Sequence, residues 1–508
     1  MKKLLSVLLC LAMLLGFAGC AGGSGGGGGE DLPPLNVPDG KPTYADDDQM
    51  TFYAYAGPRG GGYRWKVSGQ VHPDDPSGGW NSFITEKDFL DYKNAGFNLL
   101  YPENDASYDL NSKGLTATSF EDSTLYEYME LAEKVGLDVL VHSSRLTQLT
   151  MGTSPLLDED SKAYIAGMIA DLSRYDSFYG ITLKDEPKES NFRIFEQVTN
   201  YVRSIKSDCS TLTCMLPVYG APHLNVQVGG GAIPTYKKYI QDFGKLEGIF
   251  CYDYYPLRWS ASTGENYMFA TWFQNLELAA AGGREGGFDV GVVLQSCAYG
   301  PVGGKGVSDH GRSIVTKADA GFQLYSALAY GAKTIGYFTY WQHRSEGHPH
   351  ITEGFYDAMV MYPEDNGMEA VKTPAYYAVQ AANLEVQKFD HVLLNYEWQG
   401  TTALKVEDKF KQMDYIADYK APRILEASAT ADAIIGHLKD KDGYDGFMIV
   451  NVVEPSMDVT SEVTVKFREA TSAIAYVEGE ETEIQLGEDG SYTFTLDAGE
   501  GVFVIPIK

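Results

Sequence analysis

The chain has few basic residues for its size. Among its 508 residues, Lys and Arg total 40 against 69 Asp and Glu, a formal net charge of −29. Nucleic acids and anionic membrane surfaces are bound through basic faces, so this balance argues against both as partners. Motifs of several enzyme classes are missing too. No G-x-S-x-G of a serine hydrolase follows an expected strand, and there is neither a P-loop nor a G-x-G-x-x-G after the first expected strand.

Cysteine is scarce, with six residues and no C-x-x-C pair. Two of them, Cys10 and Cys20, fall at the extreme N-terminus. The other four could form one disulfide, but their apolar neighbours are more typical of core positions. These four are Cys209, Cys214, Cys251 and Cys297.

Metal-ligand patterns are also lacking. The first expected strand has no H-x-H pair of the kind a metal-dependent hydrolase uses. The cluster His343, His348 and His350 could bind a metal, but its Gly and Pro neighbours favour a solvated loop. We therefore predict neither a metal nor a cofactor.

The N-terminus has the pattern of an export signal. Lys2 and Lys3 precede a short apolar run and small residues, which is typical of a secretory signal rather than a membrane span. The sequence Phe17-Ala18-Gly19-Cys20 resembles the lipobox of bacterial lipoproteins, and this resemblance implies a signal peptide over 1–20 and lipidation of Cys20. Ordinary cleavage with release is the alternative.

A Gly- and Pro-rich stretch over 21–45 comes after the signal and is suited to a flexible tether. We therefore expect the protein on the extracellular face of a bacterial membrane. The lipid anchor would be its only membrane contact.

Residues 46–392 repeat an apolar strand, a polar loop, an amphipathic helix and a glycine. In "TEKDFLDYKNAG", Thr85 is a plausible N-cap and Gly96 ends the helix. Eight such strands are expected, at intervals typical of parallel βα units. Their ends lie near residues 57, 102, 143, 185, 218, 254, 296 and 340. This pattern predicts a closed (β/α)8 TIM barrel, with an open doubly wound sheet as the less favoured alternative.

The pattern of apolar and polar residues changes after residue 392. Short alternating runs, such as Val463, Val465 and Phe467 between polar neighbours, are separated by Gly-containing turns. We predict a C-terminal all-β sandwich over 393–508, which packs on the barrel and has no catalytic cluster of its own.

Polar residues at strand ends are the first candidates for catalysis, because barrel enzymes place their sites there. In "FYGITLKDEP", Ile181 and Leu183 are expected to face the helices. Alternation then directs Glu186 into the pocket and Asp185 towards the loop or helix layer. A partly desolvated Glu186 could hold its proton near neutral pH, while Lys184 would lower its pKa.

The strand-four "DEP" resembles the acid/base signature of glycoside hydrolase clan A, the retaining (β/α)8 glycosidases. A closer likeness is to secreted bacterial glycoside-hydrolase-like proteins, through "DEP" joined to "ALAYGAKTIGYFTYW" at residues 327–341. The resemblance implies that Glu186 is the general acid/base and that Trp341 contacts sugar. The alternative is that Asp185 and Glu186 only cap the following helix.

One residue departs from the clan pattern. Clan A has a nucleophilic Glu at the end of strand seven, where this chain has Gln295. The second carboxylate would then be Asp253, with Glu103 next and Glu353 and Asp357 after them. Inverting enzymes hold their two carboxyls ~6.5–9.5 Å apart and retaining ones ~5–5.5 Å apart.

Several further strand-end residues could handle a sugar substrate. Tyrosine and tryptophan rings offer flat faces to pyranose rings, as Tyr252, Tyr254, Tyr255 and Trp259 around the sixth expected strand could, and polar side chains bind hydroxyl groups. The expected substrate-binding residues are Asp185, Arg59, Glu103, His142, Tyr254, Gln295, Tyr340 and Trp341.

The sequence therefore predicts a glycoside hydrolase that acts on an extracellular oligo- or polysaccharide, with Glu186 and Asp253 as its catalytic carboxyls. The alternative is a glycan-binding surface lipoprotein without catalysis, which the missing strand-seven Glu favours. No feature of the sequence indicates which sugar, which linkage or which oligomeric state.

Overall fold

The computed structural model describes a large part of the chain. The described ranges are 35–46, 48–59, 84–102, 106–111, 115–152, 156–220, 233–269, 271–301, 309–341, 353–362, 369–406, 413–414 and 416–508. The expected signal peptide, Cys20 and most of the tether lie outside them. The chain divides into residues 1–35 and a compact unit, Asn36–Lys508, to which all the described helices and strands belong.

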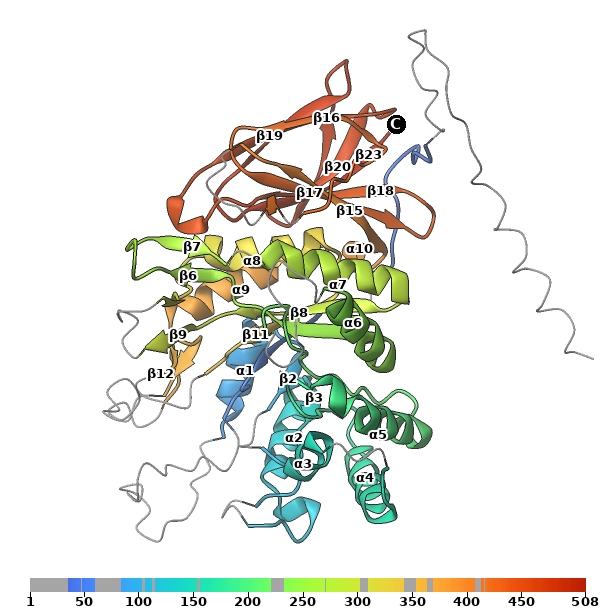
Figure 1. Cartoon of the computed structure of the whole chain (residues 1–508), viewed down its shortest axis with the longest axis vertical. Coiled ribbons are helices and arrows are strands. Elements are labelled where there is room, and N and C mark those ends of the chain that lie inside the picture. The colour runs from blue at the N-terminus through green and yellow to red at the C-terminus, as the bar shows by residue number, and fades with distance from the viewer. Residues whose placement is uncertain are drawn as a thin grey trace, which may run out of the picture. The chain divides into compact units, whose positions relative to one another are not determined.

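A parallel sheet of seven strands is the centre of this unit (Figure 1), which confirms the expected parallel α/β class. Its order is β4-β3-β2-β1-β11-β8-β5. The strands are β1 (Thr51–Tyr55), β2 (Leu99–Tyr101), β3 (Asp138–Val141), β4 (Phe178–Ile181), β5 (Ile249–Asp253), β8 (Asp289–Gln295) and β11 (Thr334–Phe338).

The expected closed barrel of eight strands is not formed. The segment 210–218, expected as the fifth strand, makes only one parallel bridge to each side, Gly180 to Ser210 and Met215 to Tyr252. Two features oppose a regular strand there. Pro217 has no N–H to donate, and the Thr213 hydroxyl donates to the Lys184 carbonyl at 3.1 Å. The sheet therefore ends at β4 and β5, with this segment between its two edges.

Helices alternate with the strands along the chain. They are α1 (Glu86–Asn94), α2 (Thr124–Val135), α3 (Ser144–Met151), α4 (Glu159–Leu172), α5 (Phe192–Ile205), α6 (Ile233–Glu247), α7 (Trp272–Gly286), α8 (Lys317–Ala329), α9 (Pro374–Val386) and α10 (Asp390–Leu393). The predicted cap of α1 is confirmed, because the Thr85 hydroxyl accepts the Asp88 N–H at 3.2 Å. Gly136 ends α2 with φ 69°, a conformation that favours glycine.

Alternation along the strands divides their side chains between two cores. One set packs inside the curl of the sheet, and the other packs outward in a larger core shared with the helices. The inner set includes Tyr53, Tyr55, Leu99, Tyr101, Leu140, Cys214, Cys251 and Val293. All four described cysteines are buried and free, so the disulfide alternative is not formed.

Short antiparallel strands come after the carboxyl ends of β5, β8 and β11. One sheet has the order β12-β9-β10-β6-β7, and β13 pairs with β14. They are β6 (Leu257–Trp259), β7 (Asn266–Met268), β9 (Ala298–Pro301), β10 (His310–Gly311), β12 (Glu353–Tyr356), β13 (Val360–Met361) and β14 (Val371–Lys372). They place further side chains at the end of the sheet where the predicted site lies.

The C-terminal part forms two antiparallel sheets, as the alternating runs predict. One sheet holds β15 (Tyr396–Leu404), β17 (Ala433–Asp440), β18 (Asp445–Asn451), β23 (Gly501–Ile507), β20 (Ser472–Val477) and β21 (Glu480–Gln485). The other holds β16 (Ile424–Ala429), β19 (Ser461–Phe467) and β22 (Ser491–Leu496). Val465 and Phe447 belong to the core between the sheets. Met448 and Phe503, on the other face of the larger sheet, join the helix core.

A buried ion cluster connects the two parts. The Arg312 guanidinium lies 2.6 Å from the carboxylate of Asp319 in α8 and 2.7 Å from that of Glu454. Glu454 immediately precedes the short helix η6 (Pro455–Met457) of the C-terminal part. All three side chains are buried.

The end of the expected tether also contacts the C-terminal part. The Tyr44 hydroxyl donates to the Asp440 carboxylate at 2.7 Å. The N–H of Lys508, the last residue, donates to the Pro38 carbonyl at 3.1 Å. Residues 36–44 therefore belong to the compact unit.

Candidate functional site

The "DEP" turn comes after β4 and is anchored from its neighbours. The Glu186 N–H donates to the Cys214 carbonyl at 2.9 Å, and the Tyr239 hydroxyl of α6 donates to the Pro187 carbonyl at 2.7 Å. Glu186 has φ 46°, in the left-handed region that a non-glycine residue rarely adopts. These bonds hold two adjacent carboxyls at the carboxyl end of the sheet.

The two carboxyls face differently from the prediction. The Tyr55 hydroxyl, on the inner side of β1, donates to Asp185 Oδ1 at 3.3 Å, so Asp185 reaches over the inner face. Ile181 and Leu183 do lie in the helix-facing core, but β4 ends at Ile181, and the period-two argument fails in the turn beyond it, where Glu186 leaves the extended conformation. Glu186 is exposed, so the expected desolvation of this carboxyl is not found.

Lys184 also differs from expectation. Its Nζ donates to the backbone carbonyls of Asp185 at 2.5 Å and Glu186 at 3.1 Å rather than to a carboxylate. Burial lowers the pKa of Lys184, against the opposing effect of the Asp185 and Glu186 charges. The lysine therefore stabilises the turn.

The helix-cap alternative is not what the structure shows. The helical segment begins at Glu189 with Lys188 as its N-cap, and the Asn191 side chain accepts the Lys188 N–H at 2.9 Å. Asp185 and Glu186 lie ahead of this start.

Asp253 ends β5 and is the buried member of the group, with 7% of its surface exposed. Burial raises the pKa of Asp253 well above its ordinary value, and the charges of Glu186 and Asp185 raise it further. Its Oδ1 has no hydrogen-bond partner among the described residues. One buried carboxyl and two exposed carboxyls thus lie within electrostatic reach of one another.

Aromatic rings border these carboxyls in an arc along the ends of five strands. The ring centroids of Tyr55 and Tyr101 are 4.1 Å apart, and Tyr55 lies 5.9 Å from Phe338. Tyr255 lies 5.7 Å from Phe338 and 5.6 Å from Tyr299. The arc therefore runs from the neighbour of Asp185 to the neighbour of Asp253.

Tyr255, one of the rings that the sequence offers to a sugar, interacts with Asp253. It lies on the inner face by alternation from Cys251 and Asp253, and its hydroxyl lowers the pKa of Asp253. The predicted Tyr254 faces the helices instead, where its hydroxyl lies 2.5 Å from that of Thr271. Period two, applied from Cys251, is the signal that distinguishes the inward Tyr255 from the outward Tyr254.

Three other predicted residues pack against aromatic rings. Tyr340 is buried in the helix-facing core, 4.9 Å from Tyr92. Trp341 is buried edge-on to Tyr362 at 5.5 Å, and the Arg59 guanidinium lies 3.5 Å from the same Tyr362 ring. Arg59 and Trp341 are thus brought together around Tyr362.

The side-chain amide of Gln295 forms hydrogen bonds with backbone groups of two other segments. Its Oε1 accepts the Leu257 N–H at 3.1 Å, while its Nε2 donates to the carbonyls of Leu257 at 3.1 Å and Arg312 at 2.8 Å. The amide has used both of its N–H groups. Gln295 therefore fixes β6 and the segment after β10.

The remaining candidates lie elsewhere at the sheet end. His142 is half-buried, with Nδ1 3.5 Å from the Thr182 hydroxyl. Asp357 accepts a 2.5 Å hydrogen bond from Ser313. Glu353 starts β12, and Glu103 lies outside the described residues.

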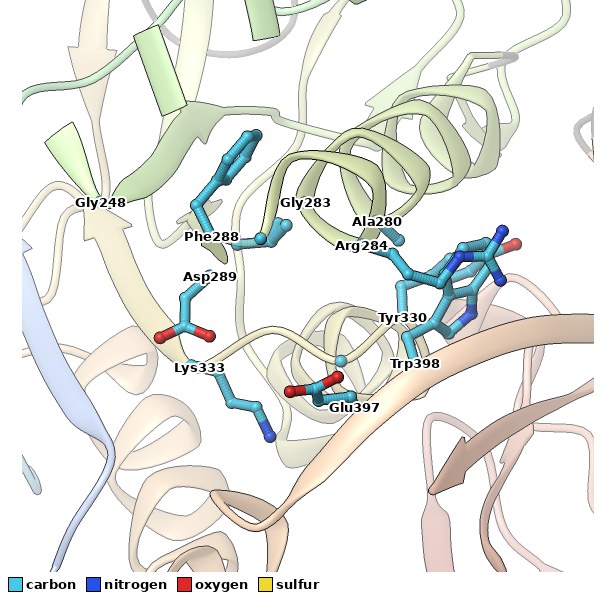
Figure 2. A pocket seen from close by; sticks show the side chains of 13 residues that line it. Gly248, Ala280, Gly283, Arg284, Phe288, Asp289, Tyr330, Lys333, Glu397 and Trp398 are labelled. Atoms are coloured by element: carbon cyan, nitrogen blue, oxygen red, sulfur yellow. The ribbon is translucent and has the colours of Figure 1, made fainter. Parts of the chain in front are cut away.

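A cavity of about 270 Å³ lies at the opposite end of the strands (Figure 2). It is bordered by the start of β8, the end of α7 and β15, with Asp289, Lys333 and Glu397 around it. Burial lowers the pKa of Lys333 to about 8, and its Nζ donates to the Tyr396 carbonyl at 2.5 Å. None of the predicted site residues lines this cavity.

No group of three or more His, Cys, Asp or Glu within the described ranges has the arrangement of a metal site. His343, His348 and His350 lie outside those ranges. Also within them, no helix combines the length and the apolar character needed to cross a membrane.

No known family matches the sequence, and no curated protein matches it. Among solved structures, the chain is similar to a protein described as a glycoside hydrolase, at 13% identity and a TM-score of 0.49, over 94% of this chain and 99% of that one. A glycoside hydrolase of family 5 from Bacteroides vulgatus aligns at 10% identity and a TM-score of 0.49, over 90% of this chain and 89% of that one.

A third similar structure is a family 27 β-L-arabinopyranosidase from Geobacillus stearothermophilus, at 8% identity and a TM-score of 0.45, over 91% of this chain and 97% of that one. At such identities and TM-scores, the activity of this chain does not follow from these likenesses. It has to be argued from the chain's own residues.

Proposed function

We propose that the protein is a glycoside hydrolase whose catalytic carboxyls are Asp253 and Glu186, with Asp185 beside them. The main observation behind the proposal is that three carboxyls lie close together at one end of a parallel sheet. One of them is buried and has a raised pKa, and the other two are exposed. Glycoside hydrolysis uses such a pair, one carboxyl protonated and one ionised.

The burial of each carboxyl indicates its role. Asp253 keeps its proton at higher pH than an ordinary aspartate, so it can protonate the glycosidic oxygen as the bond to the anomeric carbon breaks. Glu186, exposed to solvent, can accept the proton of the attacking water or stabilise the oxocarbenium-like transition state. This division reverses the roles that the sequence resemblance implies and keeps the same two residues.

The aromatic arc supports sugar binding. Tyr55 and Tyr255 each combine an apolar ring with a hydroxyl, which suits the apolar faces and hydroxyl groups of a pyranose. We include in the proposal that segment 210–218 serves as the eighth wall of a barrel, because it bridges both sheet edges. Anchoring through Cys20 at the extracellular membrane face remains part of the proposal on the sequence alone.

The test is hydrolysis of aryl glycosides and of plant or microbial oligosaccharides by the wild type and by Asp253→Asn and Glu186→Gln. Both variants are expected to lose at least about a hundredfold in kcat on oligosaccharides. Asp289→Asn, which changes an exposed carboxyl at the far cavity, is the matched control and keeps wild-type rates. If both site variants keep wild-type rates, the proposal is wrong.

A non-catalytic glycan-binding protein is the second candidate, because Gln295 fills a structural role where a nucleophile would be expected. It predicts that a broad substrate panel stays intact while calorimetry detects sugar binding. That binding would survive Glu186→Gln.

A further inference from the structure

Arg258 lies in β6, five residues after Asp253, and its guanidinium is held between two rings. The guanidinium carbon is 4.9 Å from the centroid of Tyr299 and 5.3 Å from that of Phe269. It also donates to the Tyr299 hydroxyl and interacts with the Tyr267 hydroxyl. Stacking fixes the plane of the guanidinium and leaves part of its edge for other acceptors.

No acidic side chain pairs with this cation in the described part of the chain. The Arg258 Nε is buried and has no acceptor there. Asp309, whose pKa the Arg258 charge helps to lower, bonds to other groups. It accepts the Ala261 N–H at 2.9 Å and the Tyr267 hydroxyl at 3.1 Å.

An unpaired buried donor is costly, since a lost hydrogen bond is not replaced by water. Arg312, by contrast, contacts both Asp319 and Glu454, so this acidic chain does supply carboxylates to a buried arginine. The buried Nε of Arg258, which has no acceptor among the described residues, is therefore a donor that an anionic ligand could use.

The cation adjoins the proposed catalytic carboxyls. Tyr299, on which Arg258 stacks, lies 5.6 Å from Tyr255, and the Tyr255 hydroxyl acts on Asp253. A sugar ring on the Tyr255–Tyr299 side could thus present a substituent to Arg258 while its glycosidic oxygen reaches Asp253. Planar carboxylates match the guanidinium through two parallel hydrogen bonds.

We propose that Arg258 is a specificity-determining residue that binds the carboxylate of an acidic sugar, so that the substrate class is a glycan containing uronic acid. This inference rests on the proposed function for the place of the scissile bond. Binding of the ligand does not depend on catalysis.

The test measures binding and hydrolysis separately, on the full chain. Calorimetry in the Glu186→Gln background uses galacturonate and glucuronate oligosaccharides, their methyl esters and a sulfated oligosaccharide. Esterification and Arg258→Met are each expected to weaken binding of the uronates about tenfold or more, because a charge-assisted pair is lost. Arg258→Met leaves the affinity for the methyl esters unchanged.

Two further variants separate recognition from folding. Arg284→Met is the matched control, because Arg284 also stacks on a ring, that of Trp398 at 5.1 Å, but at the far cavity. It leaves uronate affinity unchanged. Arg258→Lys retains the charge without the planar fork, and we expect an intermediate affinity. Thermal unfolding of each variant confirms that it is folded.

Each outcome bears on one of the two proposals. Equal affinity for uronates and their methyl esters, or a response only to the sulfated sugar, overturns the uronate inference and leaves the proposed hydrolase intact. Arg258-dependent uronate binding without any hydrolysis by the wild type supports the inference and overturns catalysis. If no glycan binds, both are wrong.

Discussion

Among single residues, Gln295 has a structural role that the sequence resemblance does not predict. The resemblance noted in the sequence would place a nucleophile at this position, whereas the Gln295 amide joins Leu257 to Arg312 through their backbones. A glutamate there would face two carbonyl oxygens with no N–H to offer.

Gln295→Glu is therefore expected to destabilise the protein by about 2–4 kcal/mol, since two buried carbonyls lose their donors. It is not expected to raise hydrolysis. Urea unfolding and the substrate panel measure the two effects. A variant with wild-type stability and a gain in rate would contradict the structural role of Gln295.

Glu186 combines a proposed catalytic role with an unfavourable backbone conformation, φ 46°. Glycine adopts this region without the contact between Cβ and the backbone. Glu186→Gly is expected to raise the free energy of unfolding by about 0.5–1 kcal/mol over Glu186→Ala, while both abolish hydrolysis. Chemical denaturation of the pair checks this, and equal stabilities would count against strain at this turn.

The sequence predicts the site only in part at this scale. The pair Glu186 and Asp253 follows from strand ends, and the structure brings the two within electrostatic reach. The inward placement of Asp185 could not be predicted, because β4 ends at Ile181 and the turn that follows it does not keep the alternation of a strand. Whether Arg258 has an acidic partner could not be predicted either, because its neighbours in the fold are distant in the sequence.

Among the elements, segment 210–218 and α6 are joined by an acidic residue. Glu247 ends α6, and its carboxyl accepts the Thr211 hydroxyl at 2.7 Å, while its other oxygen is buried without a partner among the described residues. Burial raises the pKa of Glu247 to about 8. The folded protein thus holds a proton that the unfolded chain releases above its ordinary pKa.

Stability from this group is complete below the ordinary pKa of ~4.3 and is lost as pH rises through about 8. Glu247→Gln removes the titrating group. The variant is expected to match the wild type near pH 5 and to exceed it by a few kcal/mol near pH 9. Thermal unfolding across this range tests it, and parallel pH profiles would refute the raised pKa.

Seven of the eight expected strands are present, and the helices alternate with them as the periodicity indicates. The fifth expected strand is the exception, for a reason that the alternation of apolar and polar residues does not show. "TLTC" has good strand residues, yet the hydroxyls of Thr211 and Thr213 bond to Glu247 and to the Lys184 carbonyl. Those partners are known only once the fold is known.

Considered as a whole, the compact unit depends on the ion cluster of Arg312, Asp319 and Glu454. Glu454→Ala leaves Arg312 with one partner and is expected to cost about 2–4 kcal/mol of stability. Glu480→Ala is the matched control, since its ion pair with Lys388 also joins the two parts but is exposed. That change is expected to cost under about 1 kcal/mol. Urea unfolding compares the two, and equal costs would contradict the role of the buried cluster.

The gap between β4 and β5 affects the order in which the molecule loses activity and unfolds on heating. A sheet edge held by single bridges opens more easily than one held by a continuous ladder. The Glu186 N–H bonds to the segment in this gap, so heat would displace the carboxyl before the rest of the fold yields. The proposed hydrolase would then lose its activity while still folded and regain its rate on cooling, so that its working temperature range is narrower than its melting temperature suggests.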